Sequence, residues 1–226
     1  LMSINKFAVS VALAGILGAS SALAETSGAF VGVQAGYGGN KATLEASGDG
    51  WKVGGDGTLS GLRYGILGGY KQFFTPEFGA RYYAVVDFSN NSEKELTLQQ
   101  DSGGEGVVQK LKINTWGINA NADVLYNFVS NESFDFGAFA GLSLGYVQHS
   151  LKTTSDEGSD TIKAGGFDLG INFGLRTNIA QNHGVELYSR FGLLEVKKEI
   201  TETDSPTQTR KSKQPYTVGL RYSFSF

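Results

Sequence analysis

The side chains of this 226-residue sequence that could act as acids or bases near neutral pH are two histidines, His149 and His183. A histidine becomes a general base when a hydroxyl group lies within hydrogen-bond reach of its ring. Ser143 and Ser150 lie near His149 in the sequence, so nucleophilic catalysis is the chemistry to consider. Adjacent residues of a β-strand point to opposite faces, however, so His149 and Ser150 cannot share a proton without a bulge. We therefore expect no catalytic residue.

Metal and cofactor chemistry has little support. The sequence has no cysteine, which excludes a thiolate metal site and a disulfide framework. Asp156, Glu157 and Asp160 offer carboxylate oxygens to calcium, but their spacing is not that of an EF-hand, and a solvated acidic loop explains them better. The glycine-rich residues 54–57 do not lie between a strand and a helix, as a phosphate-binding loop requires. We expect no metal and no cofactor.

Alternation of apolar and polar residues dominates the rest of the chain, and its last segment is the clearest example. Every second position there is apolar or aromatic, namely Tyr216, Val218, Leu220, Tyr222, Phe224 and Phe226. A period of two over this length predicts a β-strand with one apolar and one polar face. Similar segments precede it at residues 29–38, 62–73, 78–88, 116–128, 134–146, 167–179 and 185–191.

The connections between these segments alternate between long polar stretches and short turns. The long ones cover residues 39–60, 89–106, 150–166 and 195–214, and the short ones cover residues 74–77, 129–133 and 181–184. This rhythm is typical of outer-membrane barrels, which have long extracellular loops and short periplasmic turns. So many strands share an apolar face that lipid, rather than a protein core, must contact it. We predict an all-β fold, a closed antiparallel transmembrane β-barrel of about eight strands in an up-and-down meander.

Aromatic residues are expected where barrel strands meet the lipid headgroups. Threading the strands up and down puts one ring near the periplasmic edge, namely Phe30, Tyr70, Phe78, Phe128, Phe134, Phe224 and Phe226. It puts a second ring near the outer edge, namely Tyr37, Tyr64, Phe88, Trp116, Tyr146, Phe167 and Tyr216. A soluble eight-stranded barrel of the lipocalin kind is the structural alternative, and it would turn its apolar faces inward.

Residues 1–24 differ in composition from the rest of the chain. Lys6 precedes an apolar run, and small residues lie just before Glu25. This is the pattern of a secretory signal peptide, whose removal leaves a barrel domain of residues 25–226. The apolar run is shorter than the roughly 18 residues that a membrane-spanning helix needs.

The polar faces of the predicted strands carry ten charged residues, namely Arg63, Lys71, Arg81, Asp87, Asp123, Asp168, Arg176, Glu186, Arg190 and Arg221. Eight strands enclose an interior just wide enough for side chains to fill it. The six cations and four anions among them should pair there, because an unpaired buried charge is costly. We predict a lumen sealed by ion pairs, with a narrow ion-conducting channel as the alternative.

Three stretches near the C-terminus carry a family resemblance. They are Phe167-Asp168-Leu169-Gly170, GLRTNIAQNHGVEL from Gly174 to Leu187, and YTVGLRYSFSF from Tyr216 to Phe226. They resemble the outer-membrane protein family known best from Helicobacter, whose members are barrels described as adhesins or porins. The large adhesins carry an inserted extracellular domain, for which this chain has no room. The resemblance also implies that four residues form the signal read by the barrel-assembly machinery, namely Gly219, Tyr222, Phe224 and Phe226.

The sequence therefore predicts a monomeric barrel of a Gram-negative outer membrane, with a structural or surface-interaction role. The expected partners are outer-membrane lipid and lipopolysaccharide, the barrel-assembly machinery, and a host or other extracellular ligand at the loops. A formal net charge of −3 argues against nucleic acid. The first alternative function is a narrow porin and the second is a lipid A-modifying enzyme. Such an enzyme would need His149 at the outer rim, because His183 falls in a predicted periplasmic turn.

Overall fold

The fold is that of a computed structural model, which describes residues 25–48, 51–91, 94–98, 107–131, 133–155, 158–200 and 207–226. Its strands are β1 (Gly28–Gly48), β2 (Trp51–Phe73), β3 (Phe78–Asn91), β4 (Lys94–Leu98), β5 (Val107–Ser130), β6 (Phe134–Ser155), β7 (Gly158–Ile179), β8 (His183–Gly192), β9 (Val196–Ile200) and β10 (Thr207–Ser225). No helix in this part of the chain is long and apolar enough to cross a membrane. The signal peptide expected at residues 1–24 lies outside the described residues and stays a prediction.

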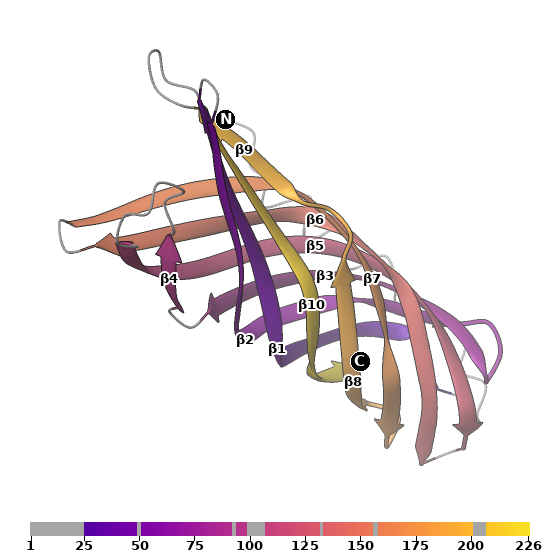
Figure 1. The fold of residues 1–226 in the computed structure, drawn as a ribbon. Coiled ribbons are helices and arrows are strands. Elements are labelled where there is room, and N and C mark those ends of the chain that lie inside the picture. The colour runs from indigo at the N-terminus through magenta and orange to yellow at the C-terminus, as the bar shows by residue number, and fades with distance from the viewer. Residues whose placement is uncertain are drawn as a thin grey trace, which may run out of the picture.

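Successive long strands pair antiparallel, and β1 pairs with β10, which closes the sheet into a barrel (Figure 1). The ring runs β1, β2, β3, β5, β6, β7, β8, β10 and back to β1. The short strand β4 pairs with β5 beyond the end of β3, and β9 pairs with β10 beyond the end of β8. The predicted eight-stranded meander is confirmed, with two of its strands resuming after a break.

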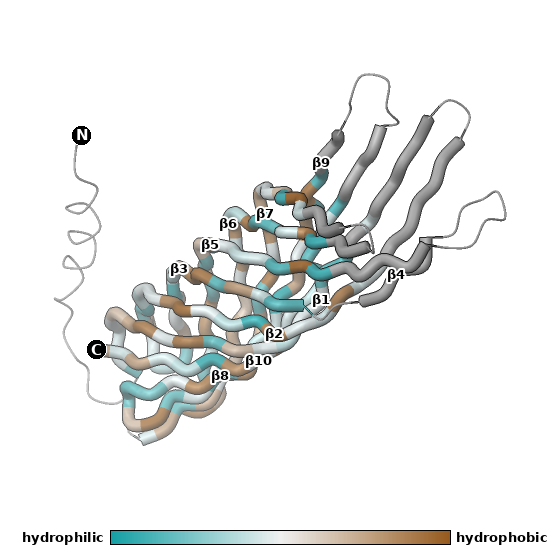
Figure 2. Tube along the Cα trace, turned by 90° about the vertical axis from the view of Figure 1, so that its left-hand side faces the viewer, coloured by the Kyte–Doolittle hydropathy of each residue, from teal (hydrophilic) through white to brown (hydrophobic). Residues whose placement is uncertain are grey.

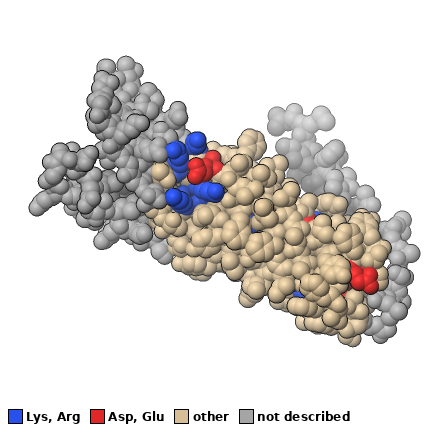
Figure 3. All heavy atoms as spheres, turned by 45° about the vertical axis from the view of Figure 1, so that its right-hand side comes forward, with Lys and Arg blue, Asp and Glu red and all other residues tan. Residues whose placement is uncertain are grey.

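The alternation of residue types turns the apolar faces outward. Val124 is 50% exposed while the adjacent Asp123 is 3% exposed, and Tyr222 is 42% exposed while Arg221 is 5% exposed. Figure 2 shows the same alternation of hydrophobic and hydrophilic residues along the strands. In Figure 3, the face toward the viewer is almost free of charge between its two ends. A continuous apolar surface of this kind requires lipid as its solvent.

The strands are longer than the sequence predicts. The predicted extents of the four long loops are wrong, because paired strands occupy much of each of them. β6 and β7 pair without interruption from Phe134 and Ile179 to Ser155 and Gly158, so residues 150–155 and 158–166 continue the two strands as paired arms of a β-hairpin. Residues 39–48 and 51–60 of another predicted loop are likewise the paired ends of β1 and β2, and the other two predicted loops contain β4 and β9. Beyond the bilayer, water solvates both faces of a strand, so neither face needs apolar residues. The backbone hydrogen bonds between the strands continue there, but no alternation of apolar and polar residues marks them in the sequence. A tilted strand crosses in about 9–11 residues, so roughly half of each of these long hairpins projects from the membrane.

Aromatic pairs line the outer surface at two levels. The pairs near the long hairpins include Tyr64–Phe88 and Trp116–Tyr146, and those near the short turns include Tyr126–Phe128 and Phe224–Phe226. Phe30 is an exception, and its predicted place in the periplasmic ring is wrong. It lies inside the barrel, 4% exposed, and packs with Leu67, Tyr83 and Val85. Phe30 occupies an inward position of β1, so strand alternation decides its location and its aromatic character does not.

Candidate functional site

The register of the sheet brings the ten predicted lumen charges into the interior of the barrel. Arg81 faces Asp123 across β3 and β5, and Arg221 faces Glu186 across β10 and β8. Nine of the ten residues are buried, and the side chain of Arg190 is 13% exposed. Each of the ten makes an ion pair at 3.1 Å or less. Among the described residues, these ion pairs form a set of four separate groups along the lumen.

At the centre of this set, two arginines share Glu186. Arg81 donates to both carboxylate oxygens of Glu186, and Arg221 donates to its Oε2 at 3.1 Å. Arg81 Nε also donates to Asp123 Oδ2 at 2.9 Å, and the same oxygen accepts the Tyr83 hydroxyl at 2.9 Å. Because β3 and β8 lie on opposite sides of the ring, the contact between Arg81 and Glu186 joins opposite walls of the barrel.

Aromatic rings inside the barrel complete the surroundings of the two arginines. Arg81 Cζ lies 4.9 Å from the centroid of Tyr83 and 4.4 Å from that of Phe139. Arg221 Cζ lies 5.1 Å from the centroid of Tyr83 and 4.8 Å from that of Tyr188. A planar, weakly hydrated guanidinium stacks favourably on such faces. The sequence prediction listed charges alone, although Tyr83 and Tyr188 share the inward phase of their strands.

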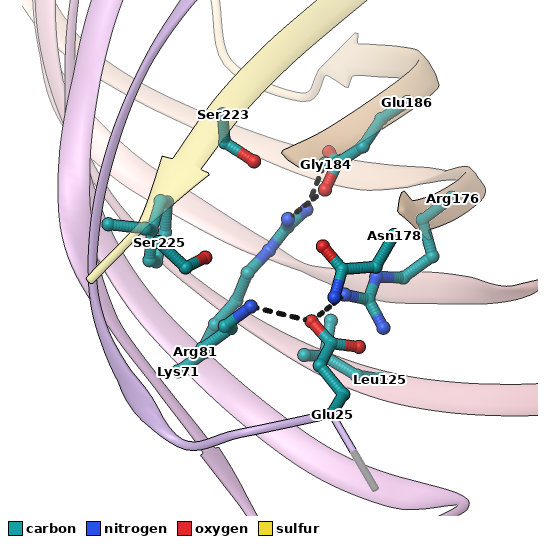
Figure 4. Close-up of a pocket in the computed structure, with 11 residues that line it drawn as sticks. Glu25, Lys71, Arg81, Leu125, Arg176, Asn178, Gly184, Glu186, Ser223 and Ser225 are labelled. Atoms are coloured by element: carbon teal, nitrogen blue, oxygen red, sulfur yellow. Dashed lines mark hydrogen bonds and ion pairs between the residues drawn. The ribbon is translucent and has the colours of Figure 1, made fainter. Parts of the chain in front are cut away.

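Glu25 lies at the short-turn end of the lumen, and the sequence prediction missed its role. Its side chain is 0% exposed, and its Oε1 accepts hydrogen bonds from Lys71 Nζ at 2.8 Å and from Arg176 Nη2 at 2.5 Å (Figure 4). Arg176 also donates to Asn127 Oδ1 at 2.8 Å. The excess of predicted lumen cations over anions was the signal that an acidic residue from outside the strands was missing.

Further interior contacts lie nearer the long hairpins. Arg63 Nη2 donates to Asp87 Oδ1 at 2.6 Å, and its Nη1 donates to Gln214 Oε1 at 2.6 Å. Leu59 and Ile113, 2% and 1% exposed, pack together in an apolar cluster with Leu151. The interior therefore combines ion-paired and apolar contacts.

One pocket lies among the charged side chains at the short-turn end. The pocket in Figure 4, lined by Glu25, Lys71, Arg81, Arg176 and Glu186 among others, offers about 10 Å³ to the centre of a water-sized sphere. A single water molecule needs about 10–15 Å³ by this measure. The pocket therefore has room for about one water molecule.

The two histidines lie far apart. His149 is inside the barrel, 3% exposed, and its Nδ1 lies 2.9 Å from Thr115 Oγ1. Ser143 Oγ accepts a hydrogen bond from Arg190 Nε at 3.0 Å, and Ser150 lies on the outward-facing side of β6. The described geometry therefore pairs His149 with a threonine and with neither serine.

His183 lies on the outside of the barrel at the short-turn end, where its Nδ1 is 2.8 Å from the hydroxyl oxygen of Tyr222. The acidic residues considered for calcium cannot be placed, because Asp156, Glu157 and the side chain of Asp160 lie outside the described part of the structure. Among the described side chains, no group of three histidine or acidic residues is arranged to hold a metal ion.

An apolar outer surface around a charged, packed interior is the organisation of an outer-membrane barrel, and the comparison of sequences gives the family. The family described as Helicobacter outer membrane protein matches residues 65–226. The chain belongs to this family. It is therefore a protein of the bacterial outer membrane, and the match extends well beyond the C-terminal stretches that first showed the resemblance. No curated protein matches the sequence.

Solved structures similar to this family member are also outer-membrane proteins. OprG from Pseudomonas aeruginosa is 12% identical, with 90% of this chain and 99% of OprG covered and a TM-score of 0.48. Neisserial surface protein A is 17% identical, with coverages of 88% and 99% and a TM-score of 0.43. The outer membrane protease OmpT from Escherichia coli is 7% identical, with coverages of 92% and 99% and a TM-score of 0.47.

The four residues of the predicted assembly signal lie on or beside β10. Gly219 faces Gly36 of β1 at the closure of the barrel, where an added Cβ would lie 2.3 Å from the carbonyl oxygen of Ala35. A side chain at this position would therefore force the two strands apart, which gives Gly219 a packing role. Tyr222, Phe224 and Phe226 follow on the outward side toward the short-turn end, and their role as a signal stays a prediction.

Proposed function

We propose that this outer-membrane protein is a sealed, non-catalytic barrel that stabilises the membrane and presents its long hairpins to ligands outside the cell. The observation that carries the proposal is the ion-paired lumen. We further propose that it acts as a monomer, that the barrel-assembly machinery inserts it, and that its lipid partners include lipopolysaccharide.

The packing of the lumen favours a sealed barrel over the alternative of a narrow porin. Conduction requires polar groups that bind ions weakly enough to release them. Here the charged groups are committed to one another across the barrel, as in the pairing of Arg81 with Glu186 and of Arg176 with Glu25. An entering ion would have to break these pairs in a region of low dielectric constant, where each broken pair leaves an uncompensated charge.

The projecting hairpins support the surface role. The β1–β2 and β6–β7 hairpins continue as paired ladders far beyond the length that a bilayer requires. Binding to a paired backbone ladder costs less conformational entropy than binding to a flexible loop, because the ladder is already ordered before the ligand binds. This arrangement suits contact with another surface.

The surroundings of His149 support a barrel without catalysis. Its partner Thr115 is a weak nucleophile that no further described group activates, and both residues are buried in the lumen. A lipid substrate in the outer leaflet would have to reach through the barrel wall to contact this ring. A lipid A mass spectrum altered by a His149→Ala substitution would contradict this part of the proposal.

Conductance of the refolded chain in a planar bilayer tests the sealed lumen. We expect no stable conductance steps, because the lumen charges pair with one another and not with passing ions. The double variant Arg81→Ala/Glu186→Ala removes both members of the pair that joins opposite walls, so it should increase ion leakage. Large, stable and reproducible conductance from the unaltered protein would instead favour the narrow porin.

Shortening one hairpin tests the surface role. Lys41 faces Thr58 across β1 and β2, so replacing residues 42–57 by a two-residue Asn-Gly turn preserves the register below. We expect whole cells carrying this variant to lose most of their binding to host surfaces while the barrel assembles normally. A second variant shortens the β6–β7 hairpin in the same way, where Leu151 faces Ile162. Undiminished binding by both variants and by a variant with both hairpins shortened would contradict the surface role.

A further inference from the structure

Two cations from opposite walls of the barrel form an anion site at the short-turn end of the lumen, and Glu25 fills it. Lys71 belongs to β2 and Arg176 to β7, which lie on opposite sides of the ring. Their side chains are only 6% and 5% exposed, and both donate to the same oxygen, Glu25 Oε1. Among the ion pairs that the structure describes, Glu25 is the partner of both cations, and neither has another. Two buried cations thus depend on one carboxylate.

The carboxylate of Glu25 satisfies this site incompletely. Its second oxygen, Oε2, is buried without a hydrogen-bond partner, and so is Nε of Arg176. A carboxylate in the best geometry binds a guanidinium group through two parallel hydrogen bonds, one to each oxygen. Glu25 accepts from Arg176 through Oε1 alone. Because an unpaired buried donor or acceptor costs free energy, the site suits a carboxylate better than it suits this tethered one.

Glu25 is attached to the barrel by a short segment outside the sheet. β1 begins at Gly28, and the described pairing of this strand with β2 begins at the same residue. Of the two residues before it, Thr26 is half-buried and Ser27 is exposed. Ser27 Oγ accepts a hydrogen bond from Phe73 N at 2.8 Å. The side chain of Glu25 can therefore leave the lumen toward the short-turn end while the strand pairing of the barrel stays intact.

Further polar groups lie around this site. Ser223 and Ser225 line the same pocket as Glu25 and are shown beside it in Figure 4. Asp135 lies at the same end of the barrel, but its two oxygens accept hydrogen bonds from Ser130 at 2.6 Å and from Asn178 at 3.5 Å. Its carboxylate is thus bound elsewhere, whereas the two serine hydroxyls are close to an anion that takes the place of Glu25.

We propose that Lys71 and Arg176 form an exchangeable carboxylate site, which a small free monocarboxylate occupies when Glu25 leaves it. The ligand takes the space of the Glu25 side chain, so acetate and its close homologues have the matching size. A tethered group competes at an effective concentration in the millimolar range or above, so a free ligand needs a concentration of that order to displace Glu25. This inference goes beyond the proposed function, and it holds whether or not the lumen conducts.

Chemical rescue of a Glu25→Ala variant tests this site, because acetate contains the atoms that the substitution removes. Loss of the buried anion should lower the unfolding temperature of the refolded chain in neutral detergent by roughly 10 °C. Added sodium acetate should recover at least half of this loss, and the recovery should grow with the logarithm of the acetate concentration. Acetamide, which has nearly the same shape but no charge, and sodium chloride at the same concentration should recover little.

Two control variants assign the rescue to this site. Asp87→Ala removes another buried carboxylate, whose partner Arg63 lies outside the pocket of Figure 4, and acetate should not restore its stability. Glu25→Ala/Lys71→Met removes one of the two cations as well and should lose most of the recovery. The proposal is overturned if acetate fails to stabilise Glu25→Ala, if chloride stabilises it equally, or if acetate stabilises Asp87→Ala to the same extent. Should Glu25→Ala not refold alone, the refolding yields in acetate and in chloride are compared instead, and equal yields would also overturn the proposal.

Discussion

Replacing Glu186 by glutamine is expected to destabilise the folded barrel by about 3–5 kcal/mol, the usual effect of removing one partner from a buried ion pair. Glutamine has nearly the same shape, so the packing against neighbouring side chains stays intact. The change removes the carboxylate that Arg81 and Arg221 share, and both guanidinium groups then keep their charge in a dry interior. Asp123 compensates Arg81 in part, whereas Arg221 is left with only neutral partners among those that the structure describes.

Unfolding by urea in detergent micelles measures this loss, and Asp168→Asn is the matched control. Asp168 pairs with one arginine, Arg190, whose side chain is 13% exposed, compared with 5% for Arg81 and Arg221. Water near Arg190 compensates the charge that the control uncovers, so its stability loss should be clearly the smaller of the two. Equal losses of stability for the two variants would show that a carboxylate shared by two arginines stabilises the barrel no more than one paired with a single arginine.

The faces of the strands could be predicted from the sequence because lipid and the lumen select opposite residue types. A bilayer demands an apolar side chain at every outward position of a crossing strand, so the period of two is visible without any contact information. The pairing of strands around the closed barrel then fixes which inward-facing residues contact one another. The ion pairs of Arg81 with Asp123 and of Arg221 with Glu186 follow from that register.

The ends of the strands could not be predicted in the same way. Beyond the bilayer both faces of a strand meet water, so residues such as those at 150–155 carry no apolar period although they continue the ladder. Glu25 was missed for a related reason, since it precedes β1 and no strand periodicity applies to it. Only the unequal number of lumen cations and anions pointed to a further carboxylate.

The family resemblance implies that Phe226 is part of a signal that the barrel-assembly machinery recognises. Deleting Phe226 tests this role separately from the stability of the folded barrel. We expect most of the truncated protein to be lost from the outer membrane and to be degraded in the periplasm. The stability of the folded barrel should change little after the deletion, because the Phe226 side chain is 71% exposed. Its ring contacts Phe224 edge-on at 5.5 Å, and its backbone amide donates to Ala29 O at 3.0 Å.

The two effects are separated by measuring surface levels in cells and stability after refolding in detergent. The refolded truncated chain should match the full chain within roughly 0.5–1.5 kcal/mol, the net contribution of the single backbone hydrogen bond that is lost. The matched control is Phe74→Ala, which removes a 56% exposed ring at the same end of the barrel and should leave surface levels unchanged. Normal surface levels of the truncated protein would refute the signal role. If instead both variants were lost from the surface, aromatic anchoring at the periplasmic headgroups would explain the requirement, and Phe226 would act through lipid and not through the assembly machinery.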